Sequence, residues 1–467
     1  MPQNVLSFII AIMNITAITA EFNPFHNGHA FLLDYARRTL CADFVLILMS
    51  GNFVQRGEPA VYDKFLRTEM ALRMGADLVL ELPSAFATAS AREFAGCAVS
   101  IAEKTGIVDT LLFGTEPGGD PEFLSCTAQL LLACEHTGSP RLKACYQESL
   151  RRSLKRGNSY PKAREEALLF VLQHGPKDEW NSFLPTMKDR TECRASSFGE
   201  DGWPAAFKAS PAALSGQISL LLSSPNNILA LEYLQALFLR RSSIRPAMAV
   251  RQGDGYHAEQ LSHSRFASAT ALRRSLLSEA DASVLSPYVP KDLKPLYESA
   301  PPIGPSALDV PLSCRLLQLE ADGTDLSSFS DVSPELADRL RKSLHRIRSF
   351  PERVEELWTK QYTRSRASRA LLHLLLGITK EQVNRLKAED YAPFLRILGF
   401  SERAKEALLP ALKKNAAVPL ITKPSAEKEL LSEEIRISDF YYALQAAAPK
   451  AAGSAVKNEC ERQIVIL

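Results

Sequence analysis

The sequence predicts an α/β protein built on a doubly wound parallel sheet, with a helical insertion and a mainly α-helical C-terminal part. Three observations predict this class. Short apolar runs alternate with segments of helical periodicity over residues 15–116. These runs end in polar or glycine-bearing turns, where parallel sheets bind their ligands. From about residue 306 onwards the pattern is mainly helical.

The expected elements follow in order along the first part of the chain. The strands are short and apolar, and they cover residues 15–20, 44–49, 76–83 and 110–116. The helices carry apolar residues at helical spacing, and they cover residues 30–38 and 63–72. A polar, glycine-bearing loop at residues 51–59 follows the second strand, so it lies where α/β proteins place ligands.

The middle of the chain reads as an insertion into this pattern. Residues 121–222 carry helical patterns with scattered charge, and loops are expected around residues 175–176 and 200–204. The α/β pattern then resumes with a helix over residues 228–234, which Asn226 or Asn227 is placed to cap. An edge strand at residues 248–251 ends in Arg251, whose guanidinium could meet a phosphate or a carboxylate.

The ends of the chain and its composition bound the class of protein. The apolar residues 5–13 have no Lys or Arg before them and run into the first strand, so we expect no targeting segment, with Met13 as an alternative start. A net charge of +2 demands no polyanionic partner. Eight cysteines without a CxxC pair argue against structural zinc and favour reduced thiols in the cytoplasm, away from membranes.

The turn after the first strand carries the strongest signal of chemistry. It reads His26-Asn27-Gly28-His29 and opens directly into a helix. Free N–H groups and the positive dipole at a helix start attract phosphate, and a glycine lets the backbone approach closely. The two imidazoles can face one side of the turn and stabilise charge on a reacting phosphate. The alternative interpretation is a pair of structural histidines at a helix cap.

A second segment complements the first. Ser268 and Thr270 stand at an expected helix start, and Arg273 lies within its first turn. Hydroxyls, helix N–H groups and a guanidinium together suit a triphosphate. The alternative is an ordinary serine or threonine cap with solvated arginines.

Six stretches of the sequence resemble, in order, the bacterial tRNA(Met) cytidine acetate ligase family, which is part of the HIGH-motif nucleotidylyl transferase superfamily. They are residues 21–29, 49–59, 75–83, 225–229, 255–257 and 366–376. The resemblance covers most of the chain from Met13. It implies a Rossmann-like HIGH-motif nucleotidylyltransferase domain over residues 13–300, with the insertion at about 121–222, followed by a mainly helical domain over residues 306–467.

The resemblance also implies a reaction. Acetate attacks the α-phosphate of ATP to give acetyl-adenylate and pyrophosphate, and N4 of the wobble cytidine of elongator tRNA(Met) then takes the acetyl group. A mixed anhydride with AMP has a good leaving group, whereas free acetate is unreactive, so no covalent protein nucleophile is needed. Mg²⁺ is expected because ATP is handled as its magnesium complex, and no protein ligand for a metal is predicted.

Site residues carry over by position. His26 and His29 are the expected catalytic residues at the phosphates. The expected ATP contacts form one continuous segment: Thr19, Ala20, Glu21, Phe22, Asn23, Pro24, Phe25, His26, Asn27, Gly28, His29, Ala30, Phe31 and Leu32. Further nucleotide contacts match Gly114, Arg251 and Asn227, with Asn226 as the alternative to Asn227, and the superfamily pattern adds Ser268, Thr270 and Arg273.

Basic residues gather in two clusters of the C-terminal part. The first comprises Arg339, Arg341, Lys342, His345, Arg346 and Arg348, and the second comprises Lys360, Arg364, Arg366 and Arg369 beside Tyr362. Such runs on helices can track RNA phosphates, and Arg364, Arg366 and Arg369 are the expected tRNA contacts. A solvated helix surface is the alternative.

Two other functions remain open at this point. A conventional nucleotidylyltransferase would join ATP to a phosphate-bearing cofactor precursor and would not need a large basic helical part. A non-catalytic RNA-binding protein would keep the His-x-Gly-His turn only as a relic, which the intact His26, Gly28 and His29 argue against. The sequence makes no prediction of the oligomeric state.

Overall fold

The structure is a computed structural model. It describes residues 13–116, 119–176, 207, 211–251, 266–279, 282–448 and 456–467. Several expectations lie outside these ranges: the nature of residues 1–12, the loop at 200–204 and the 255–257 stretch of the resemblance.

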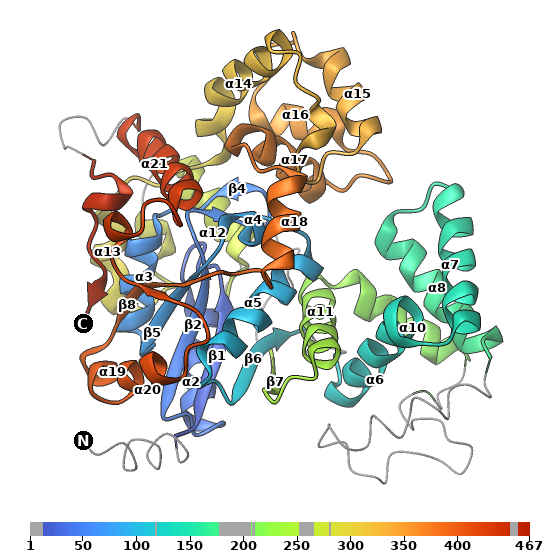
Figure 1. The fold of residues 1–467 in the computed structure, drawn as a ribbon, viewed down its shortest axis with the longest axis horizontal. Coiled ribbons are helices and arrows are strands. Elements are labelled where there is room, and N and C mark those ends of the chain that lie inside the picture. Colours follow the sequence, from blue (N-terminus) through green and yellow to red (C-terminus); the bar gives the residue numbers. More distant parts are fainter. Residues whose placement is uncertain are drawn as a thin grey trace.

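A single large sheet forms the centre of the molecule (Figure 1). Its five parallel strands are β1 (Ile15–Ala20), β2 (Phe44–Ser50), β5 (Leu78–Leu82), β6 (Thr110–Thr115) and β7 (Arg245–Val250). They lie side by side in the order β5-β2-β1-β6-β7. The chain first adds β2 and then β5 on one side of β1, and it later adds β6 and β7 on the other side of β1. The strand order therefore reverses between β1 and β6, which is the switch point of a doubly wound sheet.

Helices cover both faces of this sheet. Helices α2 (Asn27–Arg38) and α3 (Lys64–Arg73) connect β1, β2 and β5, while α5 (Ala91–Thr105) and α11 (Pro225–Arg240) connect the strands on the other side of the switch point. Right-handed crossovers place these two pairs on opposite faces. Every residue of β2 is buried, as its unbroken apolar sequence predicts.

Some elements differ in detail from the expectation. Asp63 caps α3 through its carboxylate, but neither Asn226 nor Asn227 caps α11. Ser224 occupies the N-cap position and Pro225 the first turn, since proline is well suited to a position whose N–H has no helical partner. Both asparagines instead bond Glu116 at the end of β6.

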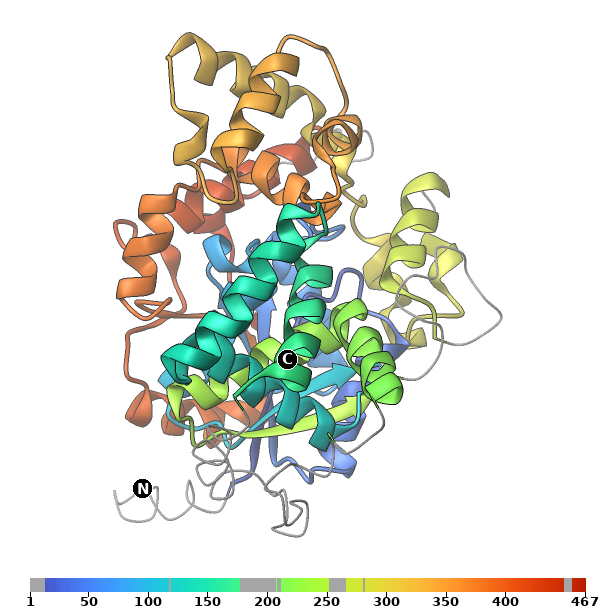
Figure 2. The ribbon, with the colours of Figure 1, turned by 90° about the vertical axis from the view of Figure 1, so that its right-hand side faces the viewer.

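The helical insertion is present between β6 and α11. It comprises α6 (Pro121–Leu132), α7 (Pro140–Lys155), α8 (Tyr160–His174) and α10 (Pro211–Ser223). These helices lie on the α11 side of the sheet, where α7 packs on α8 and α6 packs on α11 (Figures 1 and 2).

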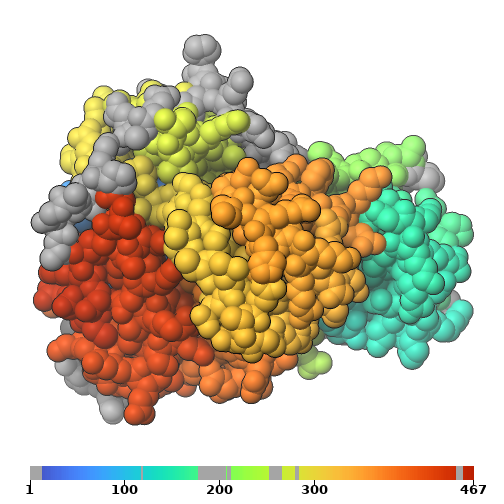
Figure 3. Space-filling view, turned by 90° about the horizontal axis from the view of Figure 1, so that it is seen from above, coloured from blue at the N-terminus to red at the C-terminus, as the bar shows by residue number. Residues whose placement is uncertain are grey.

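The C-terminal part begins as a helical unit and then returns to the sheet. Its helices are α14 (Asp309–Ala321), α15 (Pro334–Ser343), α16 (Phe350–Leu357), α17 (Arg364–Leu376) and α18 (Lys380–Ala388). Seen from above, the helical unit that begins with α14 lies between the insertion and α21 (Ser432–Ala446) (Figure 3). Strand β8 (Leu395–Phe400) then joins β5 antiparallel, and β9 (Leu420–Ile421) and β10 (Val465–Ile466) pair with β8.

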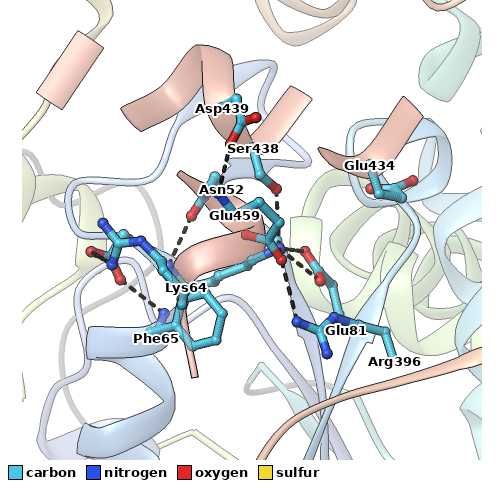
Figure 4. A network of polar contacts seen from close by, with 12 residues as sticks. Asn52, Lys64, Phe65, Glu81, Arg396, Glu434, Ser438, Asp439 and Glu459 are labelled. Carbon is cyan, nitrogen blue, oxygen red and sulfur yellow. Dashed lines mark hydrogen bonds and ion pairs between the residues drawn. The ribbon is translucent and has the colours of Figure 1, made fainter. Parts of the chain in front are cut away.

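A buried ionic network fastens this return to the sheet (Figure 4). The Lys64 ammonium lies 2.8 Å from Glu81 on β5 and 3.0 Å from Glu459 near the C-terminus. Arg396 of β8 reaches Glu459 at 3.4 Å, and Ser438 of α21 accepts a hydrogen bond from Lys64. The network thus joins α3, two strands and α21 through charges that water does not reach.

Candidate active site

A cavity of about 230 Å³ lies where the carboxyl ends of β1, β6 and β7 meet. Residues 19–23 leave β1 along one wall, Gly114 lies near the end of β6, and Arg251 follows β7. The first residues of α12 (Ala269–Glu279) close the opposite side. The cavity therefore occupies the switch point, the place at which doubly wound sheets bind nucleotides.

The His-x-Gly-His turn owes its shape to local hydrogen bonds. His26 is the N-cap of α2, and its Nδ1 accepts a hydrogen bond from the N–H of Gly28 at 3.0 Å. His29 reaches back, and its Nδ1 accepts from the N–H of His26 at 3.2 Å. A side chain at residue 28 would displace the His26 ring, because a Cβ there would lie 2.8 Å from Cε1 of His26. The spacing of the motif is thus that of a helix capping box made from two imidazoles.

These bonds also fix the protonation of both rings. Since Nδ1 of each ring accepts, the proton of each neutral imidazole is assigned to Nε2. Burial lowers the pKa of His29 to about 3, with Arg251 adding to the effect. Burial and the neighbouring His29 hold the pKa of His26 well below its ordinary value. The rings stack with centroids 3.8 Å apart, so two neutral N–H donors stand side by side at the cavity.

The second sequence motif faces the first across the cavity. Ser268 caps α12, where its Oγ accepts from the N–H of Ala271 at 3.0 Å. Arg273 is buried, and it donates to the carbonyl of Asn23 at 2.8 Å and to Thr270 Oγ at 3.4 Å. The structure therefore brings together two segments some 240 residues apart, and it surrounds the cavity with a helix N-terminus and the guanidinium groups of Arg251 and Arg273.

Most of the site residues expected from the sequence line this cavity, but five do not. Pro24, Phe25, Asn27, Ala30 and Asn227 lie behind its wall. Phe25 is buried and its carbonyl accepts from the Tyr297 hydroxyl, while the N–H of Asn27 donates to Tyr288. Asn227 is buried with its Oδ1 accepting from the N–H of Glu116, and the alternative, Asn226, lines the cavity. These residues hold the wall in place.

The structure also adds residues to the site. Gln55 and Arg56 lie at the tip of the hairpin formed by β3 (Phe53–Val54) and β4 (Glu58–Pro59), and both line the cavity. The sequence placed this loop at a ligand-binding edge, yet it named no residue in it. Further apolar lining comes from Phe94, Phe113, Leu229, Tyr233 and Phe266, whose helical or strand spacing marks them only as core.

Glu21 is the one carboxylate among the described residues that line the cavity. Its Oε1 accepts from the N–H of Gln55 at 2.7 Å. Burial raises the pKa of Glu21, although this hydrogen bond and the nearby Arg273, Arg56 and Arg67 oppose the shift. Within the described ranges, no group of three or more His, Cys, Asp or Glu side chains is arranged to hold a metal ion.

The three arginines expected to meet tRNA lie on α17. Arg364 stacks on Trp358 with its Cζ 4.0 Å from the ring centroid, and Arg366 lies 4.8 Å from the Tyr362 ring. Arg369 differs, because it is largely buried in an ion pair of 2.8 Å with Asp331. Arg364 is exposed but also pairs with Glu355 at 2.6 Å, Arg366 is half-buried, and Arg369 holds the helical unit together.

Helix length and cysteine pairing are two further features of the described residues. Within the described part of the chain, no helix combines the length and apolar character that crossing a bilayer requires. The seven cysteines that the structure describes are all free of disulfides.

Comparisons with known proteins find relatives over most of the chain. The family model for HIGH nucleotidyl transferases matches residues 13–455. The tRNA(Met) cytidine acetate ligase of Thermoanaerobacter sp. strain X514 is 34% identical over 422 residues, which cover 90% of this chain and 91% of the relative. The ligase of Acetivibrio thermocellus is 34% identical over 444 residues, or 92% and 94% of the two chains.

A solved structure extends the likeness to three dimensions. Thermotoga maritima TmcAL, crystallised with alpha-thio ATP, matches with a TM-score of 0.77 and 29% sequence identity, covering 97% of this chain and 100% of that one. With the family model and the curated relatives, this likeness shows that the chain belongs to the tRNA(Met) cytidine acetate ligase family of HIGH nucleotidyl transferases.

Proposed function

We propose that this protein is an ATP-dependent ligase that forms a carbon–nitrogen bond between acetate and N4 of the wobble cytidine, C34, of elongator tRNA(Met). The observation that carries the proposal is the cavity at the switch point, where the paired neutral imidazoles of His26 and His29 face Arg273 and the start of α12. Relatives of this family carry the name of that ligase. The product is N4-acetylcytidine.

In the first half-reaction a carboxylate oxygen of acetate attacks the α-phosphorus of ATP. The new bond is P–O, the bond to the β-phosphate breaks, and pyrophosphate leaves. Charge grows on the phosphate oxygens, and the Nε2–H groups of His26 and His29 are placed to donate to them. Because these donors are fixed before the substrate arrives, little reorganisation is needed as the charge develops.

Neutral donors suit this site better than charged ones would. Arg251 and Arg273 already supply positive charge at the cavity, and two further cations would repel them. The imidazoles can therefore stabilise the transition state across neutral pH without gaining or losing a proton. No nucleophilic side chain of the protein is required.

In the second half-reaction N4 of the cytidine attacks the acetyl carbonyl of acetyl-adenylate. The C–N bond forms, the bond from the carbonyl carbon to the phosphate oxygen breaks, AMP leaves and N4 loses one proton. The intermediate is an anhydride that water would hydrolyse, so the apolar wall is part of the chemistry. That wall is formed by Phe22, Phe94, Phe113, Leu229 and Tyr233.

Mg²⁺ fits this cavity only as an ion that enters bound to the phosphates of ATP. Magnesium ions commonly use substrate phosphates with one or two carboxylates and keep several waters. Glu21 is the carboxylate among the described lining residues that could contact such an ion, directly or through water. The ion would neutralise charge on the leaving pyrophosphate.

The remaining roles follow from this assignment. ATP contacts are assigned to the segment from Thr19 to Leu32 and to Gly114, Asn226, Arg251, Ser268, Thr270 and Arg273, with Asn227 and the buried members of the segment supporting the wall. The exposed Arg364 and the half-buried Arg366 on α17 are assigned to the tRNA. The reaction is assigned to the cytoplasm.

The test uses purified protein, an elongator tRNA(Met) transcript, ATP, Mg²⁺ and labelled acetate, with pyrophosphate followed in parallel. We expect ATP-dependent label in the tRNA at the wobble cytidine. Pyrophosphate release without labelled tRNA would contradict the assigned acceptor. A dinucleotide product would instead support a conventional nucleotidylyltransferase, and no turnover at all would contradict the enzyme assignment.

A further inference from the structure

A second cavity, of about 310 Å³, lies between the insertion and the sheet domain. Its walls come from the N-terminal parts of α5 and α8 and from α10 and α11, and its side chains include Arg92, Tyr160, Leu222, Ile228 and Glu232. A cavity of this size is in the range of small-molecule sites. Neither half-reaction uses it.

The second cavity is a close neighbour of the ATP cavity. Helix α11 separates them, with Asn226, Leu229 and Tyr233 on the ATP side and Ile228 and Glu232 on the other. A helix with its side chains is about 10 Å wide. Both α5 and α11 begin at the carboxyl edge of the sheet, so the two cavities lie at the same edge of the molecule (Figure 1).

A balanced set of charges forms one wall of this cavity. Arg164 is buried and lies 2.6 Å from Glu232 and 3.1 Å from Glu135. Arg92, which is about half-exposed, contacts both of the same carboxylates. Two cations and two anions leave no net charge, so this wall offers no excess charge to a free phosphate. It offers a guanidinium plane held in place by its partners.

Other residues that line the cavity are aromatic or apolar. Tyr160 is the first residue of α8 and keeps 45% of its surface exposed, although it lies beside Pro161 and near Leu222 and Ile228. A half-exposed aromatic ring next to an apolar wall and a fixed guanidinium is the set of surfaces on which unstacked bases of single-stranded RNA stack. A planar, uncharged ring with a polar edge fits such a cavity better than a phosphate or an aliphatic chain.

We infer that this second cavity receives an unstacked base of the tRNA anticodon loop, close in sequence to the cytidine that enters the ATP cavity. The inference rests on the proposed function. The target cytidine can enter the ATP cavity and react at N4 only when it leaves the base stack. Its departure exposes the ring faces of the neighbouring bases. Holding one neighbour on Tyr160 and Arg92, one helix width away, fixes the register of the loop on the enzyme.

The test measures acetylation of elongator tRNA(Met) by the Tyr160→Ala variant as a function of tRNA concentration. We expect KM for tRNA to rise about tenfold or more, which is the effect of losing one base stack. Acetate-dependent ATP–pyrophosphate exchange without tRNA should stay at the wild-type rate. Tyr160→Phe keeps the ring and should behave as wild type. Phe170→Ala removes another exposed aromatic of α8, one outside the cavity, and should also have no effect.

A second measurement identifies the partner. Anticodon-loop bases other than the target are removed one at a time, and each abasic tRNA is tested with wild-type protein and with Tyr160→Ala. One abasic position should raise KM in the wild type and have no further effect in the variant, because both changes remove the same contact. Additive losses at every position would overturn the inference, as would a normal KM or an impaired exchange reaction in Tyr160→Ala. Failure of the wild type to acetylate intact tRNA would instead contradict the proposed function.

Discussion

Replacing Gly28 with alanine should separate catalysis from stability. The added Cβ would lie 2.8 Å from Cε1 and 3.0 Å from Nδ1 of His26, closer than such atoms pack. The His26 ring is buried and stacked on His29, so it has to turn away from the N–H of Gly28. The substitution therefore displaces a catalytic donor without removing it.

Gly28→Ala has two opposing effects on the free energy of unfolding, whereas its effect on the reaction rate has one direction. Losing the N-cap hydrogen bond costs about 1 kcal/mol, whereas alanine in place of glycine within a helix gains about 1 kcal/mol. The melting temperature of Gly28→Ala should therefore stay near that of the wild type. Misplacing one preorganised donor costs about 100-fold in rate or more, equivalent to about 2.7 kcal/mol in the barrier.

The assay is acetate-dependent ATP–pyrophosphate exchange, measured beside a thermal melt. Gly216→Ala is the matched control, because Gly216 is also helical and a Cβ there meets no atom within 4 Å. We expect the control to exchange at the wild-type rate and Gly28→Ala to lose about two orders of magnitude. Exchange at the wild-type rate by Gly28→Ala would refute the argument that the His26 ring must occupy its capping position. A large fall in melting temperature would refute the argument that the lost cap hydrogen bond and the gain from alanine cancel.

Three further predictions concern other charged groups. Because the pKa of His29 is about 3, pyrophosphate exchange should not fall between pH 6 and 8, and a tenfold drop per pH unit above 6.5 would show that an imidazolium is required. Arg366→Glu should weaken tRNA binding in a salt-dependent way and spare exchange, while Arg369→Glu should chiefly lower the melting temperature, since Arg369 is buried against Asp331. Burial and Glu81 raise the pKa of Glu434 to about 7, so the wild type should lose about 2.5 kcal/mol of unfolding free energy as pH rises from 4.5 to 7, and in urea melts Glu434→Gln should lack this loss.

The sequence predicted the sheet core well because each of its strands is a local pattern. The expected strand at residues 15–20 is β1 itself, and the expected runs at 44–49 and 110–116 differ from β2 and β6 by one residue. Strand β8 escaped prediction because Arg396 interrupts its apolar run. That arginine is acceptable inside a sheet only because Glu459, 63 residues later, lies beside it. A pairing across that distance leaves no periodic signal.

The active site was predictable to the extent that its chemistry lies in short motifs. His26, Gly28 and His29 interact within one helical turn, so their spacing carries both the local structure and the chemistry. Gln55 and Arg56 have no such spacing, and they reach the cavity because the β3–β4 hairpin folds over it. Asn226 and Asn227 show the remaining limit. A shift of one residue around α11 moves a side chain from the cavity to the buried side, and only the packed helix decides which asparagine lines the cavity.

The same hairpin connects the cavity to the helical unit that we propose binds tRNA. At its turn Gly57 has a positive φ of 80°, and a Cβ there would lie 2.4 Å from the backbone N of Arg369 on α17. Ser368 of that helix donates to the carbonyl of Gly57 at 2.9 Å. The hairpin that lines the cavity with Arg56 thus packs directly against the helix that displays Arg364 and Arg366. Because the hairpin and α17 pack this closely, a tRNA held on α17 as proposed has a fixed distance to the cavity, and the helical unit can position the cytidine without any residue of its own entering the site.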